Sequence, residues 1–127
     1  MGNAIVAKFG GSSLADSKQF KKAKDIIKSD ARRRFIIPSA PGKRHSNDHK
    51  ITDLFYMCHQ LSSHGLNFDE VFNIIQERYQ SICQELNIKV DIDQILKKVR
   101  DKIQSGASRD YCASRGEYLN GIILSKY

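Results

Sequence analysis

A short apolar run that ends at a pair of glycines constrains the fold of this chain more than any other feature. Ile5–Phe9 is apolar and partly β-branched, which is typical of a buried strand, and Gly10 and Gly11 follow it directly. Residues 17–29 repeat apolar side chains at helical spacing behind the potential caps Asp16 and Ser17, and Phe35–Ile37 then predicts a second strand. Strand, glycine turn, helix and strand make a βαβ unit, whose two strands should be parallel.

The rest of the chain has the period of amphipathic helices. Residues 41–50 are polar and non-periodic, so we expect an exposed, mobile loop there. Four apolar stripes follow, the third behind the potential cap Asp91, and we interpret all four as core. Their members are Ile51, Leu54, Phe55, Cys58 and Leu61; Val71, Phe72, Ile75, Tyr79, Ile82 and Leu86; Ile92, Ile95, Leu96, Val99 and Ile103; and Tyr111, Leu119, Ile122 and Ile123.

The composition fits one globular unit with an excess of positive charge. The 127 residues carry a net charge of +7, which favours anionic partners such as nucleic acid, acidic lipid or nucleotide polyphosphate. Much of the excess lies between Lys18 and Arg34, where a solvated helix face explains it. Because the sequence has no aromatic RNA-binding pattern, zinc-finger spacing or helix-turn-helix, we do not expect nucleic acid as the partner.

Cysteine, histidine and hydropathy patterns indicate the compartment. The three cysteines form no CxxC pair and have no histidine at metal-ligand spacing, so we expect buried thiols and no metal site in the protein. No apolar run approaches the roughly 18 residues of a membrane span, and no signal-peptide pattern precedes the first strand. These features predict a cytoplasmic protein without a membrane partner.

The segment from Lys8 to Ser13 has the residues of a phosphate-binding loop. Gly10 and Gly11 let the backbone approach a ligand with its N–H groups outward, and Lys8 adds a full charge at the strand end. The hydroxyls of Ser12 and Ser13 can donate to phosphate oxygens or order a hydrated Mg²⁺. The segment matches neither the Walker A pattern nor GxGxxG. Phosphoryl transfer needs such positioning and neutralising groups.

At three separate points the sequence resembles the aspartokinases of the amino-acid kinase family. The segments are Ile5–Ser13, then Pro38–Gly42 with Ile51–Leu54, and Ser114–Leu119, and together they cover nearly the whole chain. The resemblance implies an α/β, three-layer fold. Residues 1–127 would be the N-terminal part of the catalytic domain, with a mainly parallel sheet and a large helical segment.

The same resemblance implies roles for individual residues. Lys8 would be the catalytic cation on the transferring phosphate, with the glycines and serines of its loop binding ATP. Ser39, Thr52 and Glu117 would line the aspartate pocket. From the residues alone, Ser39 can also be an ordinary turn serine, Thr52 a capping hydroxyl and Glu117 a solvated helix acid. The polar stretch before Thr52 is longer than in some relatives, which makes the placement of Thr52 the least constrained.

The implied activity is transfer of the ATP γ-phosphoryl group, with Mg²⁺, to the side-chain carboxylate of L-aspartate. This step begins lysine, threonine and methionine synthesis. Family members also carry a second nucleotide-binding half and regulatory ACT domains, which these residues lack, and we expect a homo-oligomer. Because the helical pattern still runs at Ile122 and Ile123, we expect a fragment. Without the second nucleotide-binding half, we expect this fragment to be inactive alone.

Two alternatives remain open at this stage. Another amino-acid or carboxylate kinase, for example one acting on glutamate, would share the phosphate loop but not, we expect, the segment Ser114–Glu117. A non-catalytic basic binding module would explain the charge but not the glycine loop.

Overall fold

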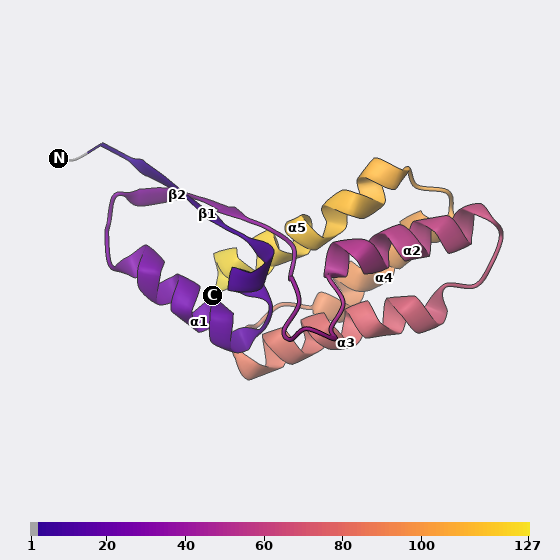
Figure 1. The fold of residues 1–127 in the computed structure, drawn as a ribbon, viewed down its shortest axis with the longest axis horizontal. Coiled ribbons are helices and arrows are strands. Elements are labelled where there is room, and N and C mark those ends of the chain that lie inside the picture. Colours follow the sequence, from indigo (N-terminus) through magenta and orange to yellow (C-terminus); the bar gives the residue numbers. More distant parts are fainter. Residues whose placement is uncertain (1–2) are drawn as a thin grey trace.

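The computed structural model describes residues 3–127 as a two-stranded sheet with one flanking helix, joined to a group of four further helices (Figure 1). In chain order the elements are β1 (Ile5–Phe9), the short 3-10 helix η1 (Gly11–Leu14), α1 (Ser17–Lys28), β2 (Arg33–Pro38), α2 (Ile51–Ser63), α3 (Asp69–Glu85), α4 (Ile92–Gln104) and α5 (Arg109–Lys126).

The predicted βαβ unit is present, and its two strands are parallel. Phe9 lies opposite Pro38, so both strands end at the same edge of the sheet. The helix between them begins behind Asp16, whose carboxylate accepts from the Gln19 N–H at 3.0 Å. The second strand is longer than predicted because it includes Arg33, Arg34 and Pro38. The alignment brings the segments that follow the two strands together.

The predicted apolar stripes form the core of the helical part. Asp91 caps α4, as predicted, by accepting from the Gln94 N–H at 3.2 Å. The α5 helix packs along α2 and then continues to β2, and its end meets α1, where the Lys24 Nζ lies 4.1 Å from the centre of the Tyr127 ring (Figure 1). All three cysteines are buried and free, as expected.

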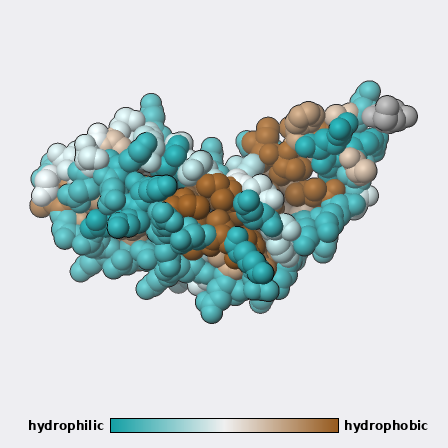
Figure 2. Space-filling model, turned by 180° about the vertical axis from the view of Figure 1, so that it is seen from behind, coloured by the Kyte–Doolittle hydropathy of each residue, from teal (hydrophilic) through white to brown (hydrophobic). Residues whose placement is uncertain are grey.

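The two faces of the sheet have different surroundings within the described residues. Helices α1 and α5 lie on the face that carries Ala7 and Ile36. The other face leaves Val6, Phe35 and Ile37 more than half exposed, and hydrophobic surface is visible at the strands beside the grey N-terminal residues in Figure 2. The prediction of a buried strand is therefore wrong for one of the two sheet faces among residues 3–127, because helices cover only the other face here.

The fold class predicted from the sequence is confirmed, since a small parallel sheet is combined with a large helical segment. Among the residues that the structure describes, no helix is long and apolar enough to cross a membrane.

Candidate functional site

The loop after β1 begins with extended backbone and with amides that no side chain caps. Gly10 is extended, with φ −72° and ψ 173°, and η1 begins at Gly11 with no side chain capping its first amides. The Ser13 N–H donates to the Gly10 carbonyl at 3.1 Å, which closes the turn. The uncapped start of this turn suits an anionic ligand better than a neutral one.

The segment after β2 packs directly against this loop. The Ser39 N–H donates to the Phe9 carbonyl at 2.9 Å, and the Gly42 N–H donates to the Gly11 carbonyl at 2.8 Å. A methyl group on Gly42 would come within 2.7 Å of the Gly11 carbonyl carbon, so only glycine permits this approach. The two predicted ligand segments therefore form adjoining walls of one site.

Helix α5 forms a further wall and is fixed to the Ser39 turn. The Asn120 amide is fully buried and donates to the Ser39 carbonyl at 2.7 Å. At Gly116 the helix comes so close that an added methyl would lie 2.5 Å from the Ala40 Cβ. The buried Tyr79 hydroxyl donates to the Gly116 carbonyl at 3.0 Å. These contacts fix the backbone that carries the next residue, Glu117.

These walls enclose a pocket of about 470 Å³. It combines backbone from the phosphate loop with hydroxyls, one carboxylate and two ammonium groups, all from segments far apart in the sequence. Its lining consists of Gly11, Ser12, Ser39, Ala40, Pro41, Gly42, Lys43, Lys50, Thr52 and Glu117.

Five of the eight predicted site residues line this pocket. They are Gly11, Ser12, Ser39, Thr52 and Glu117. Gly10 and Ser13 lie in the same loop outside the lining, and Lys8 is exposed on the uncovered face of the sheet, opposite Ile37 on β2. The structure thus brings the phosphate loop and the acceptor residues together, while their chemical roles stay predictions.

The polar side chains of the pocket are available to a ligand. No side chain caps α2, so the Thr52 hydroxyl is not the cap that its position allowed. Within the described part of the chain, the side chains of Ser39, Thr52 and Glu117 make no hydrogen bond or ion pair. Groups left free in this way can bind a ligand without first breaking protein contacts.

Sequence reasoning missed the lysines of the pocket and the arginine behind them. Lys43 and Lys50 lie in the stretch predicted to be an exposed loop, and that prediction is wrong at Pro41 and Gly42, which are buried. The arginine is Arg78, which is 4% exposed on the core face of α3. The signal in the sequence was a charged residue within an apolar helical stripe, because such a residue needs buried polar partners.

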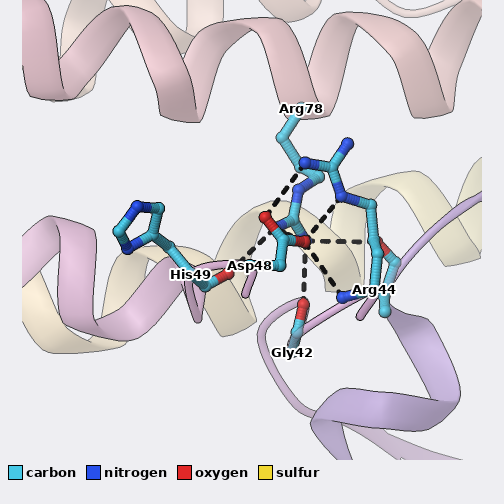
Figure 3. A network of polar contacts seen from close by, with 6 residues as sticks. Gly42, Arg44, Asp48, His49 and Arg78 are labelled. Carbon is cyan, nitrogen blue, oxygen red and sulfur yellow. Dashed lines mark hydrogen bonds and ion pairs between the residues drawn. The ribbon is translucent and has the colours of Figure 1, made fainter. Parts of the chain in front are cut away.

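A polar network surrounds Arg78 (Figure 3). The Arg78 guanidinium contacts the Asp48 carboxylate at 2.7 Å, and Arg44 contacts the same carboxylate at 2.6 Å from the solvent side. Hydrogen bonds from Arg44, together with the nearby charge of Arg78, hold the pKa of Asp48 well below its usual range. Asp48 is therefore ionised at every pH at which the protein would work.

Residues 3–127 do not supply a protein cage for a metal ion, since no group of three His, Cys, Asp or Glu side chains gathers among them. Mg²⁺ at kinase sites keeps several waters and is held largely by the phosphates of the nucleotide. The hydroxyls of the phosphate loop fit hydrogen bonding to such waters.

Comparison with known proteins gives a consistent result. No model of a known protein family matches the sequence. Aspartokinase 3 of Bacillus subtilis (strain 168) is 38% identical over 120 residues, which are 94% of this chain and 26% of the relative. Lysine-sensitive aspartokinase 3 of Escherichia coli (strain K12) is 26% identical over 133 residues, covering 98% of this chain and 28% of the relative.

Solved structures agree in fold. The crystal structure of the aspartate kinase of Clostridium acetobutylicum superposes with a TM-score of 0.96 at 61% identity, over 98% of this chain and 29% of the other. Aspartokinase III of Escherichia coli in complex with aspartate and ADP gives a TM-score of 0.75 at 22% identity, over 98% of this chain and 28% of the other, and so supports the fold alone. The chain spans little more than a quarter of the length of these relatives. In sequence and in fold, the chain is therefore similar, over nearly its whole length, to one segment of the aspartokinases.

Proposed function

We propose that the full-length polypeptide containing residues 1–127, hereafter the parent polypeptide, is an aspartate kinase. It transfers the γ-phosphoryl group of ATP to the side-chain carboxylate of L-aspartate and gives ADP and 4-phospho-L-aspartate. The observation that carries the proposal is the pocket, in which the phosphate loop adjoins Ser39, Thr52 and Glu117. The likeness to aspartokinases over almost the whole chain supports it.

The proposed chemistry needs positioning and charge neutralisation more than proton transfer. The acceptor carboxylate is already an anion at neutral pH, so no general base and no covalent enzyme intermediate are required. Lys8 and the backbone N–H groups of Gly10 and Gly11 neutralise the transferring phosphoryl group, and Ser12 and Ser13 donate to its oxygens. Lys8 lies next to the last residue of β1, close in sequence to the loop, and this role requires its side chain to extend towards the bound phosphate.

The acceptor is recognised by the three predicted substrate-binding residues, Ser39, Thr52 and Glu117. The carboxylate of Glu117 pairs with the substrate ammonium, a charge-assisted contact that selects an amino acid over a plain dicarboxylate. The Ser39 and Thr52 hydroxyls donate to the substrate carboxylates. All three side chains line one pocket, so a single small acceptor can reach them together.

Mg²⁺ is part of the proposal as a companion of ATP. When bound, it neutralises charge on the phosphate oxygens. The protein groups nearest to this task are the Ser12 and Ser13 hydroxyls, which would hold waters of its hydration shell.

The remaining expectations follow from the resemblance to the aspartokinases. We expect the product to enter lysine, threonine and methionine synthesis, and the parent polypeptide to be a cytoplasmic homo-oligomer that contacts neither nucleic acid nor membrane. Residues 1–127 would be the N-terminal part of its catalytic domain. The second nucleotide half and the ACT domains would lie elsewhere.

An acceptor panel tests the proposal. The purified parent polypeptide is incubated with ATP and Mg²⁺ plus either aspartate or glutamate, ADP release is measured, and the acyl phosphate is trapped with hydroxylamine. We expect aspartate-dependent ADP release with matching hydroxamate. Better turnover of glutamate would favour another amino-acid kinase, and salt-sensitive oligonucleotide binding without ATP turnover would favour the basic module.

A further inference from the structure

We propose that Arg78 is a positioning residue for the pocket, one that holds the segment between Gly42 and His49 so that Lys43 and Lys50 border the acceptor. The inference rests on the proposed function, because it assigns these lysines to the same site. It adds residues that neither the sequence motifs nor the phosphate loop contain.

Arg78 binds backbone from both walls of the site. One guanidinium nitrogen, Nη1, donates to the Ala15 carbonyl at 3.2 Å and to the Gly42 carbonyl at 2.8 Å. The other, Nη2, donates to the His49 carbonyl at 2.9 Å and to the Asp48 carboxylate at 2.7 Å. A single buried side chain from α3 therefore connects the end of η1 with both ends of the segment (Figure 3).

The positions of the two lysines relative to these bonds carry the argument. Lys43 directly follows Gly42, and Lys50 directly follows His49. Each lysine of the pocket thus begins one residue after a carbonyl that Arg78 holds. Residues 43 to 47 are exposed, and the hydrogen bonds of Arg44 and His45 run within the segment, to Asp48. Loss of the Arg78 bonds would remove an anchor beside both lysines at once and leave there the backbone bonds from Gly42 to Gly11 and from Ile51 to Pro41.

The contacts at position 78 favour arginine over lysine. The planar fork of Arg78 reaches four acceptors, and its charge balances the nearly buried Asp48, whereas a lysine has one nitrogen to offer. Lys43 and Lys50 face a pocket whose lining contains one carboxylate, Glu117. Two ammonium groups make this wall positive, which suits an acceptor with two carboxylates beside a polyphosphate.

The experiment compares Arg78→Lys with the unmodified parent polypeptide. Lysine keeps the charge beside Asp48 but loses the fork, so we expect the KM for aspartate to rise about tenfold while kcat changes less. Arg100→Lys is the matched control, because Arg100 pairs with Asp69 on the surface of α3 and α4. An unchanged KM in folded Arg78→Lys overturns the proposal.

Limited trypsin cleavage gives a readout that needs no substrate. Cleavage after Lys43, Arg44 and Lys50 should accelerate about tenfold in Arg78→Lys, while cleavage after Lys97 and Lys98 of α4 stays constant. Equal acceleration at all of these sites would indicate general destabilisation and overturn the proposal. Without aspartate kinase activity in the unmodified polypeptide the proposed function fails, and the cleavage pattern still decides the role of Arg78.

A second variant covers the case in which Arg78→Lys does not fold. The side chains of Lys43 and Lys50 are exposed, so the double variant with Lys43→Met and Lys50→Met should fold. We expect its KM for aspartate or for ATP to rise about tenfold. An unchanged KM for both substrates would show that neither lysine contributes to substrate binding, and the proposal would be overturned.

Discussion

Lys8 has the most demanding role in the proposed mechanism, although it lies outside the lining of the pocket. It is exposed at the end of β1, next to the loop that begins at Gly10. We predict that Lys8→Ala lowers kcat of the parent polypeptide roughly a thousandfold, because a full charge on the transferring phosphoryl group is lost. Lys21→Ala, an exposed lysine of α1, is the control. Circular dichroism should show an unchanged fold, and near-normal turnover would remove Lys8 from this role.

The reactivity of the Cys58 thiol tests how the core of the helical part is packed. Burial, with Cys112 nearby, raises the pKa of the Cys58 thiol to about 12. Since thiolate is the reactive form, we predict no alkylation of Cys58 at neutral pH in the folded protein and rapid alkylation in denaturant. Mass spectrometry of the Cys58 peptide measures this. Rapid labelling under native conditions would contradict the packing described here.

At the residue scale, the sequence predicted the parts of the site that lie in local motifs. The phosphate loop follows a strand, and Ser39 follows the next strand along the chain, so their proximity follows from parallel pairing. Arg78 could not be paired with Asp48 in advance, because the contact joins residues 30 apart and depends on how α3 packs. The same holds for Lys43 and Lys50.

At the scale of elements, the close contact between the two ligand segments should be sensitive to a single methyl group. We predict that Gly42→Ala lowers kcat/KM for aspartate about a hundredfold, because its methyl would lie 2.7 Å from Gly11 backbone that cannot move without displacing the phosphate loop. Gly121→Ala is the matched control, since its methyl would meet Pro38 at an ordinary 3.9 Å. Equal activity of the two variants would contradict the contact.

Most elements could be predicted because their signals are local. Helical periodicity and the caps Asp16 and Asp91 located α1 and α4, and the apolar stripes located the core. The segment 41–50 was predicted to be exposed because its residues are polar. Polarity alone does not reveal that the buried Arg78 binds its backbone. Pro41 and Gly42 are buried because tertiary contacts cover them.

At the scale of the whole molecule, one face of the sheet is uncovered in a chain that matches only part of the length of its relatives. Val6, Phe35 and Ile37 leave a large apolar area in solvent, and the chain matches little more than a quarter of its relatives. We predict that residues 1–127 expressed alone show no aspartate-dependent ADP release, whereas the parent polypeptide does. Turnover by the segment alone would contradict the proposal that further nucleotide-binding residues are needed.

The acceptor specificity of the parent polypeptide tests the central claim most directly. The measurement is the ratio of kcat/KM for aspartate to kcat/KM for succinate, which lacks the ammonium group, in the unmodified protein and in Glu117→Gln. Because the Glu117 carboxylate lines the pocket and is free to pair with the ammonium, we predict a strong preference for aspartate that falls at least about tenfold in the variant. An equal ratio in the two proteins would contradict the assignment of this pocket to aspartate.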